Sequence, residues 1–136
     1  MPHPGRSFSL RHIPALILAS SCTIGGLWAN WNAEAAMTEF GFPPHIAQAP
    51  QAVPVMMNGQ ARTTVLGILT FVFYFRGNYR EVDTLMTVFG FYAGLVDSYI
   101  VWKANPANLR WAFFRLAASW VFGVCGSVGL TGSGIV

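Results

Sequence analysis

Three ionisable side chains, Arg62, Asp97 and Arg115, lie within or at the edge of stretches that are otherwise apolar enough to cross a membrane. A charge in the hydrocarbon core costs about 2.5–3.5 kcal/mol even on the lenient insertion scale, so each one requires a partner, a ligand or water. An aspartate tuned by burial against arginine can transfer protons, and the arginine can hold an oxyanion. These three residues are therefore the first candidates for a catalytic site.

The composition indicates whether such a site would lie in a membrane or in water. Apolar residues make up 54 % of the 136-residue chain and charged residues 10 %, well below the roughly 25 % of an ordinary soluble domain. The mean hydropathy is +0.47. We therefore expect one integral membrane domain over residues 1–136. The net charge is +3, and the sequence has no run of basic residues. Both observations argue against nucleic-acid binding.

The apolar stretches predict an all-α membrane protein, an antiparallel bundle of four transmembrane helices with a long proline-rich first loop. The expected spans cover residues 13–31, 59–75, 84–102 and 111–130. Residues 32–57 form a loop or lid, because four prolines fall between positions 43 and 54 and would break a long helix. Within this loop, residues 33–40 can form a short interfacial helix.

Basic residues suggest the orientation of the bundle. They flank the first span and occupy the second loop, as Arg6, Arg11, Arg76 and Arg80, whereas the long first loop has none. This distribution favours cytoplasmic termini. Counting Arg62 and Arg115 as loop charges removes the asymmetry. A second interpretation of the first helix also stays open, because a cleaved signal peptide shares its basic start.

Antiparallel helices bring the three charges to one end of the bundle. Asp97 lies roughly 9 Å below the third loop, and Arg115 lies at a similar depth. Gly90 and Gly94 share a helix face with Asp97, and Ser119 shares one with Arg115. Small residues let helices approach closely, so both charges should point inward. We expect Asp97 to form a bidentate contact with one arginine.

The other arginine is then left for Glu34, a ligand or water. The candidate catalytic residues are thus Asp97, Arg115, Arg62 and Glu34. Polar residues expected near them, as candidate substrate contacts, are Asn30, Asn58, Tyr99 and Ser119. A structural interpretation has equal weight: the ion pair fixes the helix register, or an arginine extends to the lipid headgroups.

No cofactor is evident in the sequence. No set of His, Asp and Glu has zinc or di-iron spacing, and no phosphate loop, nucleophile elbow or dinucleotide fingerprint is present. His45 follows a proline in the loop and is expected at the surface, whereas His3 and His12 belong to the opposite membrane face. Cys22 and Cys125 lie in apolar stretches, where thiols are usually inert packing residues.

Several short motifs resemble a known family. Phe40-Gly41-Phe42-Pro43, then Arg62, Arg76 with Arg80, and finally Gly90, Gly94 and Asp97 resemble small four-helix membrane proteins that carry only a "domain of unknown function" label. That resemblance covers nearly the whole chain. It implies fungal relatives encoded beside polyketide and polyketide-peptide biosynthetic genes, in pathways that epoxidise, open or cyclise lipophilic intermediates. It gives Arg62 and Asp97 as family-like polar positions.

The resemblance implies a role in secondary-metabolite biosynthesis, on a lipophilic small-molecule substrate. We favour acid–base cyclisation or epoxide opening, because epoxide formation would require a partner or an unseen cofactor. We expect a multi-pass protein of the endoplasmic reticulum that contacts membrane lipid and associates with itself or with other membrane biosynthetic enzymes. The alternative is a non-catalytic scaffold or a lipid- or substrate-binding subunit. Transport is the weakest hypothesis, since the chain has no internal repeat.

Overall fold

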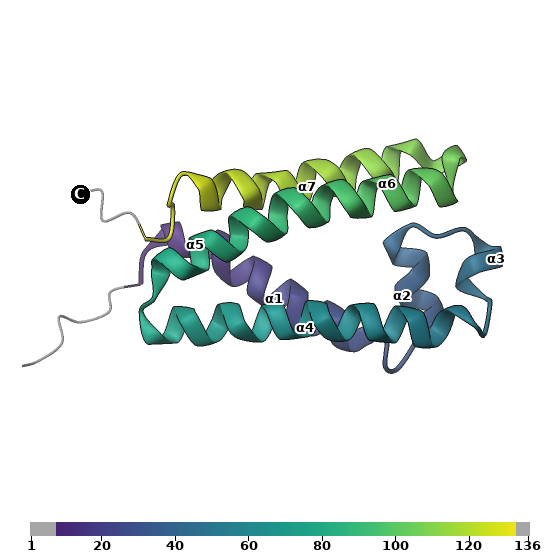
Figure 1. The fold of residues 1–136 in the computed structure, drawn as a ribbon, viewed down its shortest axis with the longest axis horizontal. Helices are drawn as coiled ribbons and strands as arrows, with labels where there is room; N and C mark the ends of the chain where they lie inside the picture. Colours follow the sequence, from purple (N-terminus) through teal and green to yellow (C-terminus); the bar gives the residue numbers. More distant parts are fainter. Residues whose placement is uncertain (1–7, 133–136) are drawn as a thin grey trace, which may run out of the picture.

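The computed structural model describes residues 8–132, and within them the chain is helical and contains no strand. Four long helical segments run antiparallel, and the described ends of the chain lie at the same end of the molecule (Figure 1). The expected all-helical architecture is confirmed. Arg6, used above for the orientation, and His3, placed above at the opposite membrane face, lie outside the described residues.

The first long segment is α1 (Ile13–Trp28), which follows the short 3₁₀ turn η1 (Leu10–His12). The second is α4 (Ala52–Arg76). The third is continuous from Tyr79 to Ala104 and consists of α5 (Tyr79–Val88), the π-helical η2 (Phe89–Ala93) and α6 (Gly94–Ala104). The 3₁₀ turn η3 (Pro106–Asn108) leads into the fourth, α7 (Leu109–Ser127).

The long loop contains two short helices, α2 (Ala33–Phe40) and α3 (Pro44–Ala47). The predicted helix over residues 33–40 is therefore confirmed. Asn32 caps α2 by accepting a hydrogen bond from the Ala35 amide at 2.9 Å. However, α4 begins at Ala52, inside the segment expected to be loop. Pro54 is its third residue, and proline is tolerated in a first helical turn because the amide there has no helical partner.

The helices form two packed pairs. α1 lies along α4, whereas α7 lies along α5, η2 and α6 (Figure 1). The pairs meet near the loop at residues 77–78, where a core cluster contains Leu18, Val82 and Met86. At the other end α2 and α3 lie between the pairs. The molecule is therefore filled by a packed core at one end, and the loop segment closes the other.

Two segments of the described chain are long and apolar enough to cross a membrane, Leu10–Trp28 and Tyr79–Ala104. This judgement rests on length and composition alone. α4 and α7 are long helices but do not pass the same test, and Asn58, Gln60 and Arg62 lower the apolar character of α4. A bundle of four membrane spans therefore stays a prediction.

Candidate functional site

A cavity of about 770 Å³ lies between the two helix pairs, with walls from α1, α2, α3, α4, η2, α6 and α7. Most of the wall is apolar and includes Leu18, Val55, Phe89 and Phe122. Such a volume is typical of sites for small organic molecules. Seven elements thus contribute to one apolar chamber.

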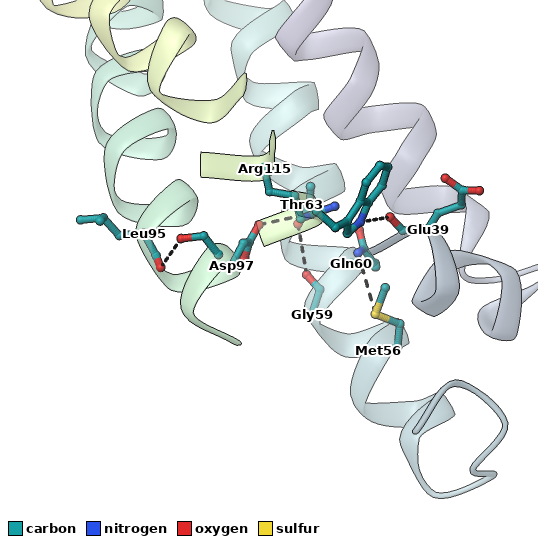
Figure 2. Close-up of polar contacts among 10 residues, drawn as sticks. Glu39, Met56, Gly59, Gln60, Thr63, Leu95, Asp97 and Arg115 are labelled. Carbon is teal, nitrogen blue, oxygen red and sulfur yellow. Dashed lines mark hydrogen bonds and ion pairs between the residues drawn. The ribbon is translucent and has the colours of Figure 1, made fainter. Parts of the chain in front are cut away.

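Two of the charged residues that line the chamber, Asp97 and Arg115, are on facing turns of α6 and α7. Asp97 Oδ2 lies 3.9 Å from Arg115 Nη2, and the two side chains are 32 % and 24 % exposed. Figure 2 shows them pointing toward one another. The expected bidentate contact is wrong, because 3.9 Å is too long for a hydrogen bond. The two side chains attract one another electrostatically, but most of their hydrogen-bond donors and acceptors stay free to contact another molecule.

Small residues determine where these two side chains lie. A Cβ atom on Gly90 would collide with the backbone of Gly123, and one on Gly94 would lie 2.7 Å from Ser119 Cβ. Both contacts lie on the stripes that predict close packing of these helices, so that prediction is confirmed. Since Asp97 follows Gly94 by one turn on the same face, close packing brings its carboxylate to α7.

The loop segment completes the site from the side of α2. The Phe40 ring lies under the Arg115 guanidinium, with Cζ 3.9 Å from the ring centroid, and it stacks on Phe42 at 5.0 Å. A cation over an aromatic face is attracted by the ring quadrupole. Arg115 therefore lies between a carboxylate on α6 and an aromatic ring on α2.

Hydrogen bonds and a glycine hold this segment against α6 and α7. Trp111 Nε1 donates to the Glu39 carbonyl oxygen at 3.0 Å, and Asn105 Nδ2 donates to the Gly41 carbonyl oxygen at 3.4 Å. Gly41 ends α2 at φ 111°, a left-handed conformation that favours glycine. A Cβ atom here would collide with the Trp111 ring. The Phe40-Gly41-Phe42 motif thus docks the loop onto the site.

Two neutral polar residues of α4, Gln60 and Thr63, also line the cavity. The Gln60 amide has a long contact of 3.9 Å to Met56 Sδ, and the Thr63 hydroxyl donates to the Gly59 carbonyl oxygen at 3.4 Å (Figure 2). Neither was among the sequence candidates for a role in the site. The sequence signal that could have identified them is their spacing of three residues, which places both on one face of a helix.

Only part of the predicted site converges. Asp97, Arg115 and Ser119 line the cavity, whereas Arg62 and Asn58 are exposed on α4 outside it. The cause is helical phase: residues 60 and 63 face the cavity, so residue 62 points away at about 100° per residue. The expected single site of three charges is thus reduced to an aspartate and one arginine.

The remaining candidates also lie outside the cavity. Asn30 is exposed just after α1. Glu34 is exposed on α2 and lines a separate hollow of about 340 Å³, so it does not pair with an arginine of the site. Tyr99 is 56 % exposed and packs against Trp102 on the outer face of α6.

No group of three His, Cys, Asp or Glu in residues 8–132 could hold a metal ion. His45 is exposed on α3, as expected. His12 lies at the opposite end of the helices, where it is buried and its Nδ1 is 3.0 Å from the Tyr74 hydroxyl. Cys22 and Cys125 are both free, and Cys22 lines the cavity.

The fold and the cavity define the class: a protein whose described residues are helical, with an aspartate–arginine pair in the wall of an apolar chamber. The chain belongs to the family described as "Domain of unknown function (DUF4267)", whose model matches residues 19–130. The resemblance to a family with that kind of label is thereby confirmed. The matched region includes every residue that lines the cavity except Leu18, since α1 begins before the match does. Comparison with curated proteins and with solved structures gives no match.

Proposed function

We propose that the protein is a four-span membrane enzyme that carries out acid–base chemistry, either cyclisation or epoxide opening, on a lipophilic small molecule. The observation that carries this proposal is the Asp97–Arg115 pair in the wall of an apolar cavity of about 770 Å³. A proton-transfer group and an oxygen-binding cation beside a hydrophobic chamber are the parts that such a reaction requires.

The proposed reaction is an isomerisation that needs no added oxidant. The Asp97 carboxylate takes the proton of a substrate hydroxyl, whose oxygen attacks an epoxide carbon of the same molecule. The new C–O bond forms as the epoxide C–O bond breaks, and the oxygen that leaves becomes an alkoxide. Arg115 stabilises this alkoxide, which then takes the proton from Asp97. Atoms and charge balance, and Asp97 returns to its starting state.

The outer surfaces of the helices support a membrane location for all four. α4 exposes Val65 and Ile68, and α7 exposes Phe113 and Val121, each by 47–63 %. Glycine, alanine and threonine occupy many buried positions of the same helices, such as Gly67, Thr70, Ala112 and Gly123. Large apolar side chains outside and small ones inside are typical of helices that pack in lipid.

We place the protein in the endoplasmic reticulum, with both termini in the cytoplasm. Arg76 and Arg80 at the second loop, together with Arg11, support this orientation. The cavity then opens toward the lumenal leaflet. The resemblance to fungal proteins encoded beside polyketide genes supports a role in secondary-metabolite biosynthesis, on a polyketide-type intermediate made by neighbouring membrane enzymes.

The test compares metabolites from three strains of the source organism: a deletion, Asp97→Asn, and Glu81→Gln as a control. Glu81 is an exposed carboxylate on α5 that does not line the cavity. Asp97→Asn should accumulate the same intermediate as the deletion while its protein level in the membrane stays normal. Glu81→Gln should give the parental profile.

A non-catalytic subunit predicts a different outcome. If the ion pair only fixes the register of α6 against α7, Asp97→Asn should lower the amount of protein, and the metabolites should fall in proportion to it. A normal profile from Asp97→Asn at normal protein level would rule out the catalytic proposal.

A further inference from the structure

The ionisable groups that face the cavity limit the charge of a ligand that it can hold. They are Asp97 on α6, Arg115 on α7, Glu39 on α2 and the Cys22 thiol on α1, whereas α3, α4 and η2 contribute none. Two carboxylates and one guanidinium therefore belong to the residues of the cavity wall, and Asp97 is the carboxylate that pairs with Arg115. Figure 2 shows the Glu39 carboxylate pointing away from the other two groups. Among the described residues, the positive charge of the cavity wall is the Arg115 guanidinium, which has Asp97 beside it.

The ion pair leaves both a hydrogen-bond donor, on Arg115, and hydrogen-bond acceptors, on Asp97, free to bind a ligand. Among residues 8–132, Arg115 Nε has no hydrogen-bond partner, and the guanidinium is 3.9 Å from Asp97. A ligand hydroxyl can donate to the carboxylate, and a second ligand oxygen can accept from the guanidinium. Such a ligand satisfies both groups without adding charge. Burying a further carboxylate here would instead place two anions beside one cation, at a large desolvation cost.

The other polar groups of the wall are neutral. Gln60 and Thr63 face the cavity from α4, and Ser119 faces it from α7. They can donate to or accept from alcohol, ether and carbonyl oxygens. None of them can compensate a ligand anion in an apolar setting.

We propose that the cavity selects neutral lipophilic molecules that carry a hydroxyl together with a carbonyl, ether or epoxide oxygen, and that it discriminates against lipophilic acids. The hydroxyl donates to Asp97 and the second oxygen accepts from Arg115. This assignment rests on the same site as the proposed function. It concerns binding alone and requires no turnover.

The test measures the binding of two fluorescent probes to the full-length protein in nanodiscs: a conjugated polyene alcohol that also carries an ether oxygen, and the matching polyene carboxylic acid, at a pH at which the acid is ionised. Displacement by the non-fluorescent alcohol corrects for partition into lipid. The wild-type protein should bind the alcohol about tenfold more tightly than the acid, or better. Asp97→Asn should cancel or reverse this preference, because Arg115 then lacks its carboxylate.

Glu81→Gln removes one negative charge at the other end of the helices and should leave the ratio of the two affinities unchanged. Arg115→Gln should widen the preference for the alcohol, which supplies a second variant if Asp97→Asn does not insert. Equal or tighter binding of the acid by the wild-type protein would overturn the proposal. So would a ratio that Asp97→Asn does not change.

The two proposals fail in different ways. A clear preference for the alcohol, combined with normal metabolites from Asp97→Asn, would leave the selective cavity standing and remove the catalytic function. A preference for the acid, combined with loss of product in Asp97→Asn, would do the reverse.

Discussion

Asp83 is a buried carboxylate whose partners lie 48 and 49 residues away in the chain. It is 5 % exposed and accepts hydrogen bonds from the backbone amides of Thr131 at 2.9 Å and Gly132 at 2.6 Å. Gly129, at φ 67°, helps to reverse the chain after α7. Asp83 thereby joins the end of the chain to α5, far from the cavity.

Replacing Asp83 with alanine should lower the free energy of unfolding by about 1–3 kcal/mol, because the buried amide of Thr131 and the partly buried amide of Gly132 lose a charged acceptor. Thermal unfolding of the purified protein in detergent measures the effect. Glu81→Ala, an exposed carboxylate two residues earlier, should change stability by only about 0.5 kcal/mol or less. Equal destabilisation by the two variants would show that the hydrogen bonds to Thr131 and Gly132 contribute little.

Sequence alone identifies site residues when their presence in an apolar stretch is costly. Asp97 and Arg115 were candidates for that reason, and the structure brings them together. Gln60 and Thr63 were not among the candidates because the sequence does not show which neutral polar residues of α4 face the neighbouring helices. Arg62 was grouped with the pair because its depth is right. Its direction depends on the rotation of α4 about its axis, which the sequence did not reveal.

At the scale of elements, glycines determine how closely α1 and α4 approach. A Cβ atom on Gly26 would collide with the Thr64 hydroxyl and lie 2.8 Å from the Gln60 carbonyl oxygen, and one on Gly67 would lie 2.6 Å from the Thr23 amide. By contrast, a Cβ atom on Gly25 meets nothing within 4 Å. Neighbouring glycines of α1 thus have different roles.

Gly26→Ala should destabilise the protein by about 1–3 kcal/mol, because backbone atoms of α4 must move to accept the methyl group. Gly25→Ala should be neutral, or stabilising by up to about 1 kcal/mol, since alanine favours a helix over glycine. Chemical unfolding in mixed micelles compares the two variants. Similar losses in both would contradict the close packing of α1 on α4.

The sequence predicts the number of long helical segments better than it predicts their first and last residues. The third segment begins at Tyr79 rather than at the predicted residue 84, because polar first-turn residues such as Glu81 are favourable at a helix start. The fourth ends at Ser127 rather than at residue 130. The π-helical η2 depends on a shift in backbone hydrogen bonds, which composition does not encode.

At the scale of the whole molecule, the two ends differ in how they are packed. The end near residues 77–78 contains the buried cluster of Val82, Met86 and their neighbours. The other end contains the cavity and the docked α2 and α3. The packed cluster holds the helix pairs together, and the cavity begins where this cluster ends, at Leu18 and Cys22.

The proposed topology predicts that the two ends lie on opposite sides of the membrane. Gln48→Cys, at the exposed end of α3, should react with an impermeant maleimide only from the lumenal side. Asn78→Cys, at an exposed position in the loop between α4 and α5, should react only from the cytoplasmic side. Labelling of unsubstituted protein in sealed microsomes measures the background from Cys22 and Cys125. Reaction of both positions from one side would refute a four-span topology.

The most direct test of the central claim is conversion of a neutral hydroxy-epoxide by the purified protein. The substrate is the intermediate that accumulates in the deletion strain, and the product is measured by chromatography and mass. Wild-type protein should convert it to an isomer of unchanged mass, and Asp97→Asn should lower the rate by about 10²-fold or more, with Glu81→Gln unaffected. Wild-type rates from Asp97→Asn would contradict an acid–base role for this residue.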